Sequence, residues 1–110
     1  MLLDHCVPRR FGGELPGHEV KTAASQGWAA LQNGELLRNA AGSFEVFITT
    51  DRKLPQQQNA STLPLPVIVV IAVNNRFETL APLAPEVLRL LERKLERRIY
   101  FVDNDGKRQR

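Results

Sequence analysis

One stretch of the sequence decides the fold: Pro66-Val67-Ile68-Val69-Val70-Ile71-Ala72-Val73. Both of its alternating faces are apolar, which is typical of a strand in the middle of a parallel sheet that helices cover on both sides. A parallel neighbour also requires a crossover connection, usually a helix, between the two strands. The stretch therefore predicts an α/β domain with a mostly parallel sheet.

Strand patterns recur on both sides of this stretch. Apolar, β-branched and aromatic residues predict further strands at 1–4, 18–22, 44–50 and 99–102. The strand at 44–50 delivers Asp51 at its carboxyl end, and the polar connection 54–65 is expected to be a loop with one helical turn.

Helix patterns separate these strands. A helix is expected to start near Pro8, which fits a first turn, and to end at Gly12-Gly13. A second is expected over 34–41, with Asn33 as its N-cap, and an amphipathic third over 84–98. The alternation predicts one three-layer α/β/α domain over 1–103, followed by a basic tail at 104–110.

Composition excludes several classes of protein. The chain has 110 residues, 43% of them hydrophobic, which suffices for one core but not for two domains. Its single cysteine cannot form an internal disulfide, and residues 1–10 lack a signal-peptide pattern, so a cytoplasmic protein is expected. The longest apolar run is too short for a bilayer, so no membrane association is expected. The net charge of +3 is compatible with nucleic acid and requires none.

Acidic residues follow several predicted strands. Asp4, Asp51 and Asp103 each come after a strand, and Glu35 lies in the first turn of the helix behind Asn33. Ligands of open α/β sheets bind at the carboxyl ends of strands, and a carboxylate cluster there favours a hard divalent cation such as Mg²⁺ or Mn²⁺. An ion of this kind suits phosphodiester hydrolysis.

Each carboxylate also has a purely structural interpretation. Asp4 could cap the following helix, Glu35 could complement the helix dipole, Asp51 could close an Asx turn and Asp103 could belong to a turn. Zinc is disfavoured, because adjacent His5 and Cys6 with a distant His18 lack the paired spacing of zinc ligands.

Two groups of basic residues could contact nucleic acid. Four lie beside the predicted acidic edge and are candidates for positioning RNA phosphates, unless they pair with the carboxylates: Arg9, Arg10, Arg52 and Lys53. Arg89, Arg93 and Arg97 recur along one ridge of the last predicted helix, where a solvated helix face is the alternative.

Several short motifs resemble, in order, those of the small bacterial PIN-like domain proteins, relatives of the PilT N-terminus nucleases. The resemblance runs from Leu2 to about Val102 and rests on these pieces: Leu2-Leu3-Asp4, Val7-Pro8-Arg9-Arg10, Leu15-Pro16-Gly17-His18-Glu19-Val20, Gly27-Trp28, Asn33-Gly34-Glu35-Leu36-Leu37, Thr49-Thr50-Asp51-Arg52 and Gln57-Gln58-Asn59.

The resemblance implies an α/β/α fold and metal-dependent cleavage of single-stranded RNA, as by the toxin of a toxin–antitoxin pair. The family's acidic residues fall on Asp4, Glu35 and Asp51, with Asp103 assigned from strand order alone. Where the family commonly has Asp-Glu-Asn, this chain has Asp4-His5-Cys6. The leading hypothesis is therefore an Mg²⁺- or Mn²⁺-dependent endoribonuclease, with an antitoxin protein as partner.

Two alternatives to the nuclease stay open. A catalytically silent PIN-like domain would bind RNA or a partner protein without cutting, as the departure at His5 and Cys6 favours. A receiver-like phosphoacceptor domain would also use acidic strand ends, but it needs a lysine after a late strand, where this chain has Asn74-Asn75 and Asp103. The sequence is compatible with both a monomer and a homodimer.

Overall fold

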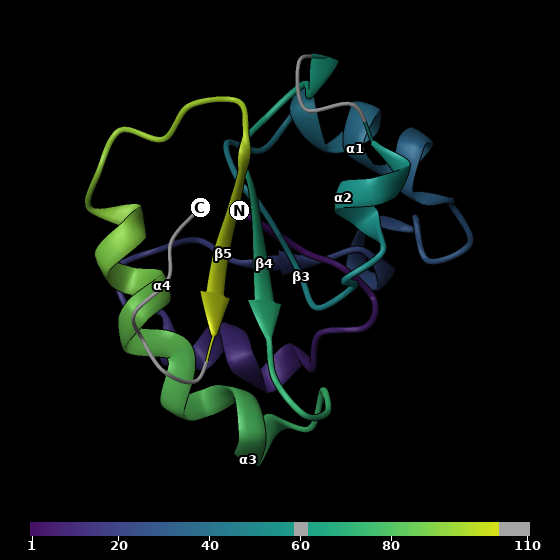
Figure 1. The fold of residues 1–110 in the computed structure, drawn as a ribbon. Coiled ribbons are helices and arrows are strands. Elements are labelled where there is room, and N and C mark those ends of the chain that lie inside the picture. Colours follow the sequence, from purple (N-terminus) through teal and green to yellow (C-terminus); the bar gives the residue numbers. More distant parts are fainter. Residues whose placement is uncertain (59–61, 104–110) are drawn as a thin grey trace.

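The computed structural model, described for residues 1–58 and 62–103, contains a five-stranded sheet in which every pair of neighbouring strands is parallel (Figure 1). The strand order is β2-β1-β3-β4-β5. The strands are β1 (Leu2–Leu3), β2 (Lys21–Thr22), β3 (Phe47–Thr49), β4 (Val67–Ile71) and β5 (Ile99–Asp103). The prediction of an α/β domain with a parallel sheet is confirmed.

Helical segments cover both faces of the sheet. The segments are η1 (Arg9–Glu14), η2 (Ala24–Gln26), α1 (Asn33–Ala41), α2 (Leu54–Gln57), α3 (Phe77–Leu80), η4 (Ala81–Leu83) and α4 (Ala84–Leu91), where η denotes a 3₁₀ helix. The α1 and α2 helices pack on one face, and η1, α3, η4 and α4 pack on the other (Figure 1). In the described part of the chain, no helix is long and apolar enough to cross a membrane.

The apolar stretch that predicted the fold alternates between two cores. Val67 and Val69 of β4 point into the core under α1 and α2, whereas Ile68 and Val70 point into the core under α4. All four side chains are at least 98% buried. Since β4 pairs with β3 on one side and with β5 on the other, its two apolar faces are both explained.

The last long helix is shorter than its periodicity predicts. The α4 helix ends at Leu91 instead of Arg98, and two short helical segments, α3 and η4, precede it. A helix over 84–98 would be about 22 Å long, whereas five-residue β4 spans only about 17 Å. The chain leaves the helix early because it must return to start β5 beside β4. Leu95 nevertheless packs against the core, which explains the misleading period.

Two local predictions at helix ends are wrong. Gln32, not Asn33, is the N-cap of α1, because its extended backbone places its carbonyl to accept the first helical bond, from Leu36 N at 2.8 Å. Gly12-Gly13 does not end the first helical segment but lies inside η1. A Cβ atom on Gly12 would lie 2.9 Å from Val20 Cγ1, so this glycine permits a close approach of the two segments.

The strands are shorter than predicted, apart from the last. Pairing is confined to two residues in 1–4 and in 18–22, three in 44–50 and five in 66–73. The last strand runs one residue further, so Asp103 pairs with Ile71 inside the sheet instead of starting a turn. The predicted tail at 104–110 lies outside the described residues.

Gly27 provides a test of the local backbone. Its φ of 78° lies in the left-handed region, where a Cβ atom costs roughly 1–2 kcal/mol. We expect Gly27→Ala to lower the free energy of unfolding by about 1 kcal/mol, measured by urea denaturation. Gly13→Ala is the matched control, because a Cβ there meets no atom within 4 Å. Equal stability of both variants would contradict the assigned turn.

Candidate functional site

The candidate site lies where the order in which successive strands are added to the sheet reverses direction. From β1 the chain moves to β2 at one edge of the sheet, and from β2 it crosses to β3 on the other side of β1. In doubly wound sheets, ligands bind outside the carboxyl ends of the two strands that flank this change in direction. Here those strands are β1 and β3, and the residues that follow them are Asp4 and Thr50-Asp51.

Asp4 is buried at the carboxyl end of β1, with only 1% of its surface exposed. The Thr49 hydroxyl donates a hydrogen bond of 2.7 Å to Asp4 Oδ2, and the His5 backbone N–H donates one of 2.8 Å to Asp4 Oδ1. A buried carboxylate requires such partners, because burial without them is costly. The bond from Thr49 holds the Asp4 carboxylate against the end of β3, and the bond from His5 comes from the turn that follows β1.

His5 and Cys6 also contact this carboxylate. Because β1 ends at Leu3, both residues lie in the turn behind it. His5 Nε2 lies 3.5 Å from Asp4 Oδ1, and Cys6 Sγ donates to Asp4 Oδ2 at 3.6 Å. The Thr50 hydroxyl in turn donates to Cys6 Sγ at 3.1 Å. Each oxygen of Asp4 therefore has two protein partners.

Asp51 is linked to Asp4 through a single hydroxyl group. The Asp51 backbone N–H donates to Thr49 Oγ1 at 3.0 Å, while the same hydroxyl donates to Asp4. The Asp51 side chain accepts a bond of 2.9 Å from the Lys53 backbone N–H, which is the Asx turn anticipated as its structural role. Asp51 is half-buried and therefore more accessible than Asp4.

An open hollow of about 570 Å³ lies in front of these residues. His5 and Asp51 line it from the ends of β1 and β3, Gly34 lines it from the start of α1, and Gln58 follows α2. Asp4 is not among its lining residues, so the buried carboxylate lies behind the surface that His5 presents.

The structure does not bring the other two predicted ligands to this hollow. Glu35 is exposed in the first turn of α1 and is absent from the lining. Asp103 ends β5, which is two strands away from β3, or about 10 Å at the usual strand spacing. Among the residues described, no group of three or more histidine, cysteine, aspartate or glutamate side chains could hold a metal ion.

Two of the four predicted carboxylate ligands, Asp4 and Asp51, remain at this edge of the sheet. Mg²⁺ prefers oxygen ligands and is commonly held by one or two carboxylates, with water and substrate phosphate completing its shell. Asp4 and Asp51 follow neighbouring strands at one edge of the sheet, and the Thr49 hydroxyl links the Asp4 carboxylate to the Asp51 backbone N–H. A four-carboxylate cage that includes Glu35 and Asp103 does not fit this arrangement.

The four basic residues that were predicted to position RNA do not line the hollow. Four were singled out from the sequence, all of them exposed, and none forms an ion pair within residues 1–58 and 62–103: Arg9, Arg10, Arg52 and Lys53. The alternative in which they neutralise the carboxylates therefore finds no support in the described contacts.

The loop between β4 and α3, residues 72–76, also contacts the segments around the site. No role in the site was predicted for this loop from the sequence. Arg52 Nη2 donates to the Ala72 carbonyl at 2.8 Å, and Asn75 Nδ2 donates to the Cys6 carbonyl at 2.9 Å. The Arg10 guanidinium stacks on the Phe77 ring, 4.1 Å from its centre. The loop thus ties together the segments that follow β1 and β3. The only signal for it in the sequence is the polar pair Asn74-Asn75 behind an apolar strand.

Comparison of the chain with protein-family models, with curated proteins and with solved structures gives no match. The arrangement at the ends of β1 and β3 therefore carries the functional argument together with the motif resemblance.

Proposed function

We propose that this protein is a PIN-like, metal-dependent endoribonuclease that cleaves single-stranded RNA, with Asp4 and Asp51 holding Mg²⁺ or Mn²⁺. The observation that carries the proposal is the Thr49 hydroxyl, which contacts the Asp4 side chain and the Asp51 backbone where the strand order changes direction. The order of motifs from Leu2 to Val102 is the support for the PIN-like assignment and for a role as a toxin with an antitoxin partner. The proposal applies equally to a monomer and a homodimer.

The chemistry divides between the ion and the protein. When bound, the ion would polarise the phosphodiester and make water more acidic. Asp51 lines the hollow and would supply a carboxylate ligand there, and the Thr49 hydroxyl fixes the Asp51 backbone relative to the Asp4 carboxylate. The exposed cations Arg52 and Lys53, directly behind Asp51, would attract the RNA backbone.

A cleavage assay tests this proposal. A labelled pool of single-stranded RNA is incubated with the protein in Mn²⁺, in Mg²⁺ and in EDTA, and the products are separated on a denaturing gel. We expect cleavage in the two metal-containing reactions and none in EDTA. Cleavage that persists in EDTA would contradict the metal dependence.

A specific observation favours a second candidate function, a silent PIN-like domain that binds RNA without cutting it. His5 and Cys6 stand where the family commonly has a glutamate and an asparagine, and both contact Asp4. Asp4 is buried and already contacts protein groups through both carboxylate oxygens. Binding a metal ion would break some of these contacts, which costs free energy. Saturable RNA binding without cleavage in any metal would favour this candidate.

Restoring the family pattern separates the two candidates. We expect the double variant His5→Glu/Cys6→Asn to bind Mn²⁺ about tenfold more tightly and to cleave RNA faster, because it adds oxygen ligands beside Asp4. Calorimetric titration and the cleavage assay measure the two effects. His18→Glu is the matched control, since it adds the same charge in a segment away from the hollow. A gain in the control equal to that of the double variant would contradict a local effect.

A further inference from the structure

A second depression crosses the opposite edge of the sheet, at the amino ends of the strands. It encloses about 700 Å³ and is lined by the residues that precede the strands. Met1 precedes β1, Val46 precedes β3, Pro66 precedes β4, and the segment 91–97 leads into β5. Because it lies at the amino edge, this groove is separate from the hollow at the carboxyl edge, and ligands could occupy both together.

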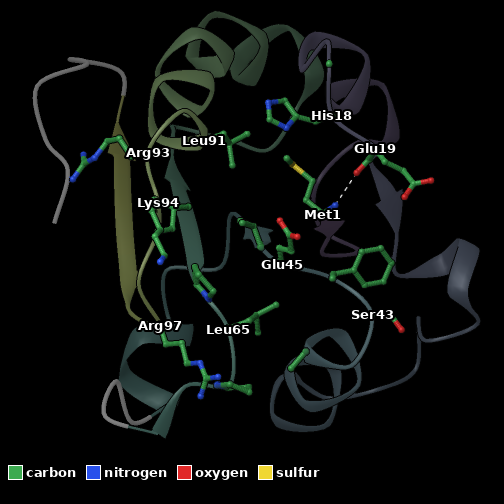
Figure 2. Close-up of a pocket in the computed structure, with 17 residues that line it drawn as sticks. Met1, His18, Glu19, Ser43, Glu45, Leu65, Leu91, Arg93, Lys94 and Arg97 are labelled. Carbon is green, nitrogen blue, oxygen red and sulfur yellow. Dashed lines mark hydrogen bonds between the residues drawn. The ribbon is translucent and has the colours of Figure 1, made fainter.

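The groove has a basic wall. Arg93, Lys94 and Arg97 follow one another along one side of the opening (Figure 2). This segment is where α4 ends early, so the three side chains border the groove instead of spreading around a helix. Lys94 and Arg97 are exposed and form no ion pair within residues 1–58 and 62–103.

The rest of the lining is acidic and apolar. Glu45 lies near the middle of the opening and Glu19 on the side away from the basic wall (Figure 2). Leu65 and Leu91 contribute apolar surface from the segment before β4 and from the end of α4. The groove thus offers cations on one side, apolar contacts between, and carboxylates towards the other side.

This distribution favours a peptide over a nucleic acid as the occupant. The RNA backbone carries a charge at every phosphate, so some phosphates would lie beside Glu19 and Glu45, whereas a peptide can confine its acidic side chains to one end. A peptide can place acidic side chains on the basic wall and apolar side chains on Leu65 and Leu91. Five strands span about 19 Å, which about six extended residues would cross.

We propose that the groove at the amino edge of the sheet binds an extended acidic and apolar peptide segment of a partner protein, with Lys94 and Arg97 as its main charged contacts. This proposal does not depend on the nuclease function, because none of the groove residues lines the hollow at the ends of β1 and β3.

Fluorescence anisotropy with defined probes tests the groove. The probes are a labelled peptide of about eight residues with glutamates in one half and leucines in the other, its lysine–leucine counterpart and a single-stranded RNA of similar length. We expect the protein to bind the acidic peptide more tightly than the basic one, and Lys94→Glu/Arg97→Glu to weaken that binding about tenfold or more.

The matched control is Lys21→Glu/Arg38→Glu, which makes the same change in net charge at two exposed cations outside the groove. It is expected to retain acidic-peptide binding within about twofold. Circular dichroism of both double variants checks that the fold is kept. The proposal would be overturned if the wild-type protein did not bind the acidic peptide, or if both double variants lost this binding equally. It would also be overturned if the groove variant bound RNA more weakly but bound the acidic peptide as the wild-type protein does.

Discussion

Replacing Asp51 by asparagine is expected to reduce metal-dependent RNA cleavage by roughly a hundredfold or more. Asp51 is more accessible than Asp4, its backbone N–H shares the Thr49 hydroxyl with the Asp4 carboxylate, and it lines the hollow at the ends of β1 and β3. The asparagine amide removes the charge and keeps an oxygen for the bond from Lys53 N, so the fold should persist. Single-turnover cleavage rates and thermal denaturation measure the two expectations.

Two further carboxylates serve as controls for this result. Asp103 lies two strands from β3, and Glu35 is exposed outside the hollow. We expect Asp103→Asn and Glu35→Gln each to change the cleavage rate by less than about threefold, which corresponds to under 1 kcal/mol. A loss in either variant as large as in Asp51→Asn would restore the four-carboxylate hypothesis and contradict the two-carboxylate site.

Replacing Phe47 by alanine is expected to lower the free energy of unfolding by roughly 3–5 kcal/mol. Phe47 is fully buried in β3, within the core under α1 and α2, and it pairs with residues of β1 and β4. Domains of this size have total stabilities of about 5–15 kcal/mol, so the variant loses a large part of the total. Urea denaturation followed by circular dichroism measures the loss.

Val73→Ala is the matched control for this core substitution. Val73 is 85% exposed, so its truncation should change the free energy of unfolding by less than about 0.5 kcal/mol. Similar stabilities for the Phe47→Ala and Val73→Ala variants would contradict the assignment of Phe47 to the core.

The hydrophobic pattern of the sequence predicts the central strand of the sheet, because a strand covered on both faces needs apolar residues at every position. The two apolar faces of 66–73 predicted a covered parallel strand, and Val67–Ile71 lies between β3 and β5. Element ends could not be predicted in the same way. The end of α4 at Leu91 depends on where the chain must turn to reach β5, and Leu95 packs against the core without being helical.

The candidate site was predictable in part for a related reason. That polar residues follow each strand can be read along the chain, and this placed Asp4 and Asp51 at one edge of the sheet. The lateral order of strands is a property of the whole fold, so sequence alone did not reveal that β4 separates Asp103 from β3. Nor did it reveal that Asp4 would be enclosed by His5 and Cys6, because the contacts within a turn depend on the local path of the chain.

Titration with Mn²⁺, followed by its paramagnetic resonance signal in the presence of a non-cleavable single-stranded RNA analogue, tests the central claim most directly. The account predicts saturable Mn²⁺ binding by the wild-type protein and its loss in Asp51→Asn, with binding retained in Asp103→Asn. Absence of saturable binding by the wild-type protein, or equal binding by Asp51→Asn, would contradict a metal site formed by Asp4 and Asp51.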